Sequence, residues 1–237
     1  MAWKEAALKH AKKEMPKEAC GLVCINKGRE KYWPCRNAAD FPSEGFLLHP
    51  DDWMKCEDMH EIVAVFHSHP GESPQPSQVD KASCEYIDLP FYICNPETEA
   101  WHYFEPSGYK APLIGRTFCW GSQDCWSLII DYFAEKGLTV KDWKRPGLPE
   151  EILTNNIFCE NNFIESGFVP LAKDAEWKIG DVLSFAFNDQ CPDHVAIYIG
   201  NGQQILHHVG GKLSSRDLYN DFYIKKTVRR YRHHEEN

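Results

Sequence analysis

Hydrophobic residues recur with two different periods over the first 105 residues. Residues 2–14 place apolar side chains on one face of a helix, and Pro16 ends that pattern before an apolar run, residues 19–25, typical of a buried strand. A second apolar run, EIVAVF at residues 61–66, predicts another buried strand. Further patterns predict strands at residues 31–36, 46–49, 90–93 and 100–104 and helices at residues 51–59 and 77–86. Together these elements predict an α/β domain.

A different order of elements follows residue 112. Helical patterns at residues 124–136 and 149–166 come first, and strand patterns follow at residues 182–187, 194–199 and 204–209. Helices followed by an antiparallel sheet predict an α+β domain. Between the two regions, the segment EPSGYKAP concentrates Pro, Gly and Ser, as an interdomain linker does. We therefore predict a first domain at residues 1–105, a linker at residues 106–112 and a second domain at residues 113–237.

The charge of the chain narrows the class of partner. Lys and Arg number 26 against 35 Asp and Glu, which gives a formal net charge of −9. Proteins that bind a phosphate backbone rely on clustered Lys and Arg, so nucleic acid is not expected as a partner. The one basic cluster, residues 225–232, is expected to be a solvated strand or tail, and contact with an anion is the alternative.

Export and membrane insertion are not predicted either. Residues 1–13 contain no apolar stretch of signal-peptide length, and no run of about 18 apolar residues occurs in the sequence, so no membrane span is expected. The ten cysteines are spread from Cys20 to Cys191 without a CxxC pair. A chain of 237 residues can fold without disulfides, so we expect mostly reduced thiols.

One group of polar residues has the spacing of a metal site. His67 and His69 end the strand at residues 61–66, where alternation points both side chains to one face, and a helix that starts near Ser77 would bring Asp80 back toward them. Two imidazoles and one carboxylate suit Zn²⁺ and leave the fourth position open for water, as in a catalytic site. Glu18 would be the general base, and Ser77 would stabilise an oxyanion. The plainer alternatives are a pair of hydrogen-bonded histidines and a solvated Glu18.

The string His67-Ser68-His69-Pro70, followed by Ser77 and Asp80, resembles the JAMM (MPN+) metalloprotease family, and KEACGLV places Glu18 where that family carries its base. The resemblance covers about residues 1–105. It implies a cytidine-deaminase-like α/β fold and cleavage of peptide or isopeptide bonds.

A second group suggests a cysteine nucleophile. Asp124 and Cys125 open the helical segment DCWSLIIDYF, and a thiol at a helix N-terminus has its thiolate stabilised by the macrodipole. Cys119 is the competing candidate. His194 would be the base, and His207 on the next strand would orient it, whereas His208 would point to the opposite face. Taken singly, each of these histidines is more often structural.

Three segments, DCWSL, KIGDVLSF and DHVAIYIGNGQQILHH, together resemble the NlpC/P60 family of papain-like cysteine peptidases. The resemblance covers about residues 113–220 and implies Cys125 as nucleophile, His194 as base and His207 as the orienting residue. Two features depart from the family pattern. Trp126-Ser127 stands where Ser-Gly is usual, and the hairpin carries one extra residue before His207.

The order of the two domains resembles that of tail assembly proteins of lambda-like phages. The resemblance implies synthesis in the host cytoplasm, presence at or near the tail tip, and contact with tail tip proteins. It also implies two peptidases, of which the second cuts peptidoglycan stem peptides and the first a tail protein or a peptide crosslink. Two rival interpretations stay open, namely processing of tail proteins alone and a structural component with vestigial sites.

Overall fold

The computed structural model describes residues 1–143, 145–188 and 191–236. The chain divides into two compact units, Met1–Lys110 and Ala111–Asn237. Each unit has its own sheet and its own hydrophobic core. No helix among the described residues combines the length and apolarity needed to cross a membrane.

The first unit is built on one mixed sheet, whose strands are β1 (Cys20–Asn26), β2 (Arg29–Cys35), β3 (Glu61–Ser68), β4 (Phe91–Cys94) and β5 (Trp101–Phe104). Within the described part of this unit, the five strands lie in the order β2-β1-β3-β4-β5. The pair β3–β4 is parallel, and the other neighbours are antiparallel. β1 and β3 are the inner strands that carry the apolar runs seen in the sequence.

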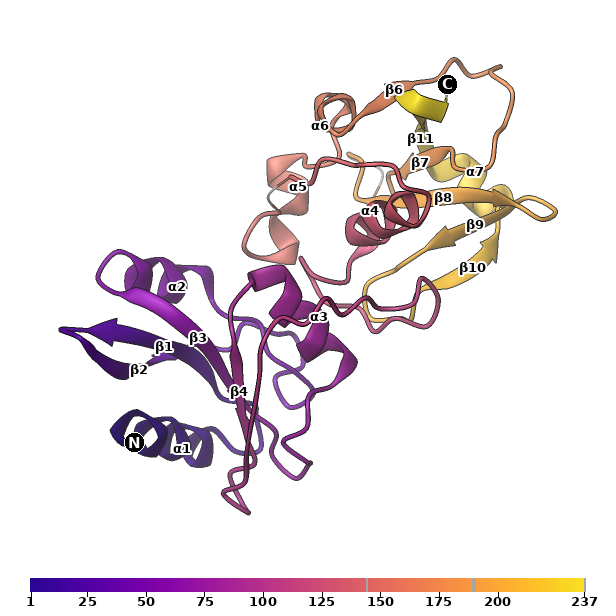
Figure 1. Ribbon diagram of the computed structural model, residues 1–237. Helices are drawn as coiled ribbons and strands as arrows, with labels where there is room; N and C mark the ends of the chain where they lie inside the picture. Colours follow the sequence, from indigo (N-terminus) through magenta and orange to yellow (C-terminus); the bar gives the residue numbers. More distant parts are fainter. Residues whose placement is uncertain (144, 189–190, 237) are drawn as a thin grey trace. The chain divides into compact units, whose positions relative to one another are not determined.

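Helices cover both faces of this sheet (Figure 1). On one face, α1 (Ala2–Glu14) buries Trp3 and Ala7 against Phe66 of β3. On the other face lie α2 (Pro50–Glu57) and α3 (Gln78–Ile87), whose Cys56 and Cys84 pack among side chains of β1. The predicted α/β class is therefore confirmed.

The strand predicted at residues 46–49 is wrong. Leu48 makes only an isolated bridge to Asn37. The Asn37 side-chain oxygen accepts from Leu47 N at 3.1 Å, and its side-chain nitrogen donates to the Gly45 carbonyl at 3.0 Å. In a strand, these backbone groups would pair with a neighbouring strand. The segment is therefore a loop, held by the Asn37 side chain and by two backbone hydrogen bonds, from Ala38 N to the Leu47 carbonyl at 2.8 Å and from His49 N to the Arg36 carbonyl at 3.1 Å.

The second unit contains an antiparallel sheet of β6 (Phe168–Pro170), β7 (Val182–Phe185), β8 (His194–Gly200), β9 (Gln204–His207), β10 (Ser215–Leu218) and β11 (Thr227–His233). The described strands lie in the order β10-β9-β8-β7-β11-β6. Its helices are α4 (Cys125–Glu135), α5 (Ile152–Asn155), α6 (Glu160–Glu165) and α7 (Asp221–Lys226), with short 3₁₀ turns at Pro149–Glu151 and His234–Glu236. The predicted α+β class is confirmed.

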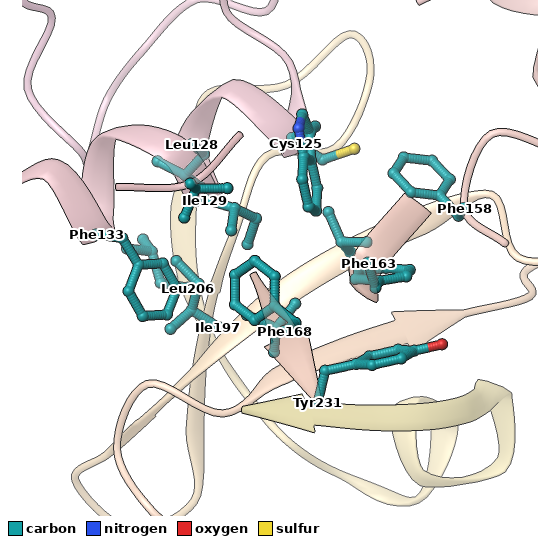
Figure 2. Packing of buried hydrophobic residues seen from close by; sticks show 14 of the residues in the cluster. Cys125, Leu128, Ile129, Phe133, Phe158, Phe163, Phe168, Ile197, Leu206 and Tyr231 are labelled. Atoms are coloured by element: carbon teal, nitrogen blue, oxygen red, sulfur yellow. The ribbon is translucent and has the colours of Figure 1, made fainter. Parts of the chain in front are cut away.

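The long helix α4 lies on one face of this sheet. Its residues Leu128, Ile129 and Phe133 pack with Ile197 and Leu206 in a buried cluster (Figure 2). On the opposite face, Phe185 and Ala196 form a smaller cluster with Tyr223 of α7. The sheet thus separates two apolar layers.

Two expectations for this unit are corrected. The single helix predicted at residues 149–166 is broken, because Asn156 adopts a left-handed conformation with φ 43° that ends α5. The basic cluster does not form a solvated strand. β11 lies between β7 and β6, and its Arg230 and Arg232 are buried in ion pairs with Asp181 at 3.4 and 2.7 Å.

Candidate active sites

Three predicted ligands converge in the first unit. His67 is the penultimate residue of β3, His69 follows the strand, and Asp80 lies in the first turn of α3. His67 Nε2 lies 3.0 Å from Asp80 Oδ1 and 3.0 Å from His69 Nε2, and His69 Nε2 lies 3.4 Å from Asp80 Oδ2. All three residues are buried.

These separations fit one tetrahedral ion. Donor atoms that each lie about 2.0 Å from a tetrahedral zinc are about 3.3 Å from one another. The observed distances of 3.0 to 3.4 Å lie close to that value. Two imidazole nitrogens and a carboxylate are also a donor set that zinc accepts in catalytic sites. The residues present therefore fit a zinc ion.

The surrounding contacts orient the two imidazoles. His69 Nδ1 lies 2.9 Å from the Ser73 carbonyl, and donation there leaves the Nε2 lone pair free for a metal. The Phe46 ring stacks on His67 with centroids 4.3 Å apart. His67 Nδ1 has no hydrogen-bond partner in the described part of the chain. Nε2 is thus the nitrogen that each ring directs toward its neighbours.

Asp80 is held by the start of its own helix. Ser77 is the N-cap, and its hydroxyl accepts from Asp80 N at 3.1 Å while Asp80 Oδ2 accepts from Ser77 N at 2.7 Å. Burial opposes the charged form of Asp80, but His67 and His69 outweigh it and hold its pKa well below the usual range. The capping contact gives Ser77 a structural role beside the predicted oxyanion role.

Glu18 is brought to the same place from a distant part of the sequence. One carboxylate oxygen of Glu18, one ring nitrogen of His67 and one ring nitrogen of His69 all lie within 4.8 Å of one another. Two bonds join the adjacent residue to β3: Ala19 N donates to Ser68 Oγ at 2.9 Å, and Ser68 N donates to the Ala19 carbonyl at 3.0 Å. Burial raises the pKa of Glu18, as a general base requires.

A cavity of about 510 Å³ includes Glu18 in its wall. Arg36 and Asp52, which form an ion pair of 2.8 Å, also line it. Of the four clustered side chains, Glu18 is the one that lines this cavity.

In the second unit, Cys125 is the first residue of α4. Asp124 caps the helix by accepting from Ser127 N at 2.8 Å, and Gly121 N donates to its other oxygen at 3.1 Å. Arg145 adds two bonds to the same carboxylate, at 2.8 and 3.2 Å, and both side chains of this ion pair are almost fully buried. This buried clamp fixes the segment that carries the thiol.

The Cys125 thiol lies against the start of β8. The Val195 backbone N–H is within hydrogen-bonding reach of the Cys125 sulfur. Figure 2 shows that sulfur pointing away from Leu206 and Ile197. Burial raises the pKa of Cys125 and the Asp124 carboxylate raises it further, so both effects oppose the stabilisation of the thiolate by the helix macrodipole. The competing Cys119 lies outside α4, in a short bridge with Gln123.

The predicted histidines His194 and His207, at the start of β8 and the end of β9, form a hydrogen-bonded chain. His194 Nε2 lies 3.2 Å from His207 Nδ1, and His207 Nε2 lies 3.1 Å from Asp217 Oδ2. The Tyr223 hydroxyl donates to the same Asp217 oxygen at 2.8 Å. Burial holds the pKa of His194 well below its ordinary value, so His194 rests as a neutral imidazole. His208 lies apart from this chain and contacts the Phe118 ring.

Sequence reasoning missed three residues of this arrangement, namely Arg145, Asp217 and Tyr223. None of them belongs to a local motif. The pairing of β9 with β10 brings Asp217 to His207, and only a strand prediction for residues 215–218 could have indicated it.

Comparison with known families agrees with the two folds. Residues 2–104 match the family of prokaryotic homologs of the JAB domain, and residues 115–232 match the NlpC/P60 family. The chain therefore carries a JAB domain followed by an NlpC/P60 domain.

Two relatives align over more of this chain than either domain alone. The tail tip assembly protein K of Escherichia phage N15 is 34% identical over 229 residues, which are 95% of this chain and 91% of that protein. That of Escherichia phage lambda is 33% identical over 193 residues, or 78% and 89%. The chain belongs to the family of tail tip assembly protein K. A desampylase of Haloferax volcanii is 24% identical over 106 residues, or 40% of this chain and 76% of that enzyme.

Proposed function

We propose that this tail tip assembly protein is a hydrolase with two peptidase sites, a zinc metallopeptidase at residues 1–105 and a cysteine endopeptidase at residues 113–237, joined by a linker at residues 106–112. The observation that carries the proposal is the convergence of His67, His69 and Asp80 at separations of 3.0 to 3.4 Å. A structural component with vestigial sites would have no reason to keep donor atoms at such distances.

In the first site, His67, His69 and Asp80 would hold the ion. Bound zinc supplies a Lewis acid that acidifies water and polarises a scissile carbonyl. Glu18 accepts a proton from the attacking water and returns it to the leaving amine, a role that its raised pKa favours. Ser77 donates its hydroxyl hydrogen to the developing oxyanion, because its oxygen is the part used for capping.

In the second site, His194 removes the Cys125 proton as the sulfur attacks the scissile carbonyl carbon. The imidazolium then protonates the departing amine, which leaves a thioester at Cys125. Water hydrolyses the thioester with His194 as base again. Because both groups rest in the neutral form, His194 acts as a general base during attack.

The proposed substrate of the cysteine site is an amide of the peptidoglycan stem peptide, and the metal site would cut a tail protein or a peptide crosslink. Tail tip proteins are the proposed partners. Family membership supports these assignments. It also supports the proposal that the protein is made in the host cytoplasm and takes a place at the virion tail.

The test is digestion of purified peptidoglycan by the wild-type protein, Cys125→Ala and His69→Ala, with products identified by mass spectrometry and zinc content measured on the same samples. We expect stem-peptide cleavage that only Cys125→Ala loses and a zinc content that only His69→Ala loses. Absence of cleavage by any form, with zinc still bound, would refute the wall substrate and favour processing of tail proteins.

A further inference from the structure

The register of three strands aligns the acid and the two histidines on one face of the second sheet. His207 lies opposite Ala196, two residues from His194, and Ile205 lies opposite Asp217. His207 is therefore the diagonal neighbour of both His194 and Asp217, a separation that long side chains bridge. The contact between Asp217 and His207 thus follows from the pairing of β9 with β10.

The hydrogen bonds that join Asp217, His207 and His194 allow only one assignment of donors and acceptors. A carboxylate accepts hydrogen bonds and has no proton to donate, so His207 must carry its hydrogen on Nε2 to bond Asp217. A neutral His207 then has a lone pair on Nδ1, which accepts from Nε2–H of His194. His194 is left with its lone pair on Nδ1.

We propose that Asp217 is a positioning residue that fixes the tautomers of His207 and His194, so that the free lone pair of His194 is on Nδ1 and available to the nucleophile. The inference rests on the proposed function, in which His194 is the base for Cys125. Asp217 touches neither the thiol nor the reacting atoms. It acts through His207.

The surroundings keep both imidazoles neutral and the acid charged. His207 is 2% exposed in its side chain and Asp217 45%. Burial lowers the pKa of His207, the Asp217 carboxylate opposes that effect, and nearby Lys212 lowers it further. Burial also lowers the pKa of His194, to which His207 and His208 add. Aromatic rings pack on the same side, Tyr223 against His207, Phe187 against His194 and Phe185 against Tyr223.

Nuclear magnetic resonance of ¹⁵N-histidine-labelled protein at pH 8 tests the tautomers directly, with His207→Gln and His194→Gln used for assignment. We expect both rings to carry hydrogen on Nε2 in the wild type. Asp217→Leu should shift His207 and His194 toward a mixture of tautomers. Asp217→Asn should preserve the wild-type pattern, because both His207 and Tyr223 bond the same oxygen and an amide oxygen can replace it.

Hydrolysis of purified peptidoglycan supplies the second readout. Asp217→Leu should lower kcat about 10- to 100-fold, the range for loss of a hydrogen bond to a charged group, with KM little changed. Asp217→Asn should recover most of the loss. Asp174→Leu, which replaces another carboxylate of the same unit, is the matched control, and thermal unfolding of each variant reports on folding.

The outcomes separate the two claims. Tautomers that stay unchanged in a folded Asp217→Leu variant would overturn the positioning role. If the wild type has the expected tautomers and Asp217→Leu alters them, the positioning role is supported. If no peptide is hydrolysed in the same experiment, only the proposed peptidase function fails.

Discussion

The two candidate sites are assembled over very different lengths of chain. In the first unit, His67, His69 and Asp80 belong to one strand–loop–helix segment, and only Glu18 comes from elsewhere. In the second unit, His194, His207 and Asp217 come from three strands and make contact only once the sheet has its register, and Cys125 comes from a helix earlier in the chain. The local site should therefore respond mainly to its ligands, and the dispersed site to packing and protonation.

Replacement of the proposed base should impair the first site alone and gives the largest expected effect. Glu18→Gln keeps the side-chain size but cannot accept a proton, so hydrolysis of an isopeptide-linked test peptide should fall about 10²–10⁴-fold. Zinc content, measured by atomic absorption, should not change. Glu5→Gln on the exposed side of α1 is the matched control. Loss of zinc from Glu18→Gln would show that Glu18 is a ligand rather than the base.

Disruption of the clamp on the cysteine helix should destabilise the second unit alone. Arg145→Met leaves the buried Asp124 carboxylate without its ion pair, which should lower the free energy of unfolding by about 3–5 kcal/mol. Urea unfolding measures this loss. Lys141→Met removes an ion pair with Glu165 in which both side chains are 66% exposed, and should change stability by less than about 1 kcal/mol. Equal losses in both variants would contradict the importance of the clamp.

Removal of metal should lower the thermal midpoint of the first unit and leave that of the second unchanged. An ion that binds only the folded unit adds about 2.7 kcal/mol when present at 100 times its Kd. Scanning calorimetry with and without a chelator measures the difference. His69→Ala should not respond to the chelator, and an equal shift in both units would contradict a metal site confined to the first.

Acid should destabilise the second unit through its buried histidines. Burial lowers the pKa of His194, and burial lowers the pKa of His208 to about 4. The unfolded chain takes up protons near pH 6.5 whereas the folded unit does not, so stability is lost as the pH falls from about 6.5 toward 4. Each kcal/mol lost should lower the thermal midpoint by about 4 °C. His208→Phe should weaken this dependence, and a midpoint constant over that range would refute it.

The sequence indicated the first group of residues better than the second for a physical reason. His67 and His69 follow an apolar strand, and Ser77 and Asp80 form a capping pattern, so short-range periodicity contains almost all the information. Asp217 lies in a strand, Ser-Arg-Asp-Leu, that has no apolar alternation and was not predicted. Its neighbour across the sheet is set by pairing, which a local pattern cannot encode.

Charged residues caused the other misjudgement. The sequence predicts that Arg230 and Arg232 are exposed to solvent, because charged side chains are seldom buried without partners. Their partner, Asp181, lies about 50 residues earlier in the chain, so the local sequence pattern does not indicate these ion pairs. The class of each domain could still be predicted, because the apolar runs of β1, β3, β7 and β8 determine it.

The position of β11 has a consequence for biosynthesis. β11 is the last strand along the chain, yet it lies between β7 and β6 in the sheet. The first unit has all its strands as soon as β5 has left the ribosome, and can fold while the rest of the chain is being made. The second unit cannot close its sheet until β11 follows. A nascent chain would thus complete the unit with the metal-type site well before the unit that carries the thiol.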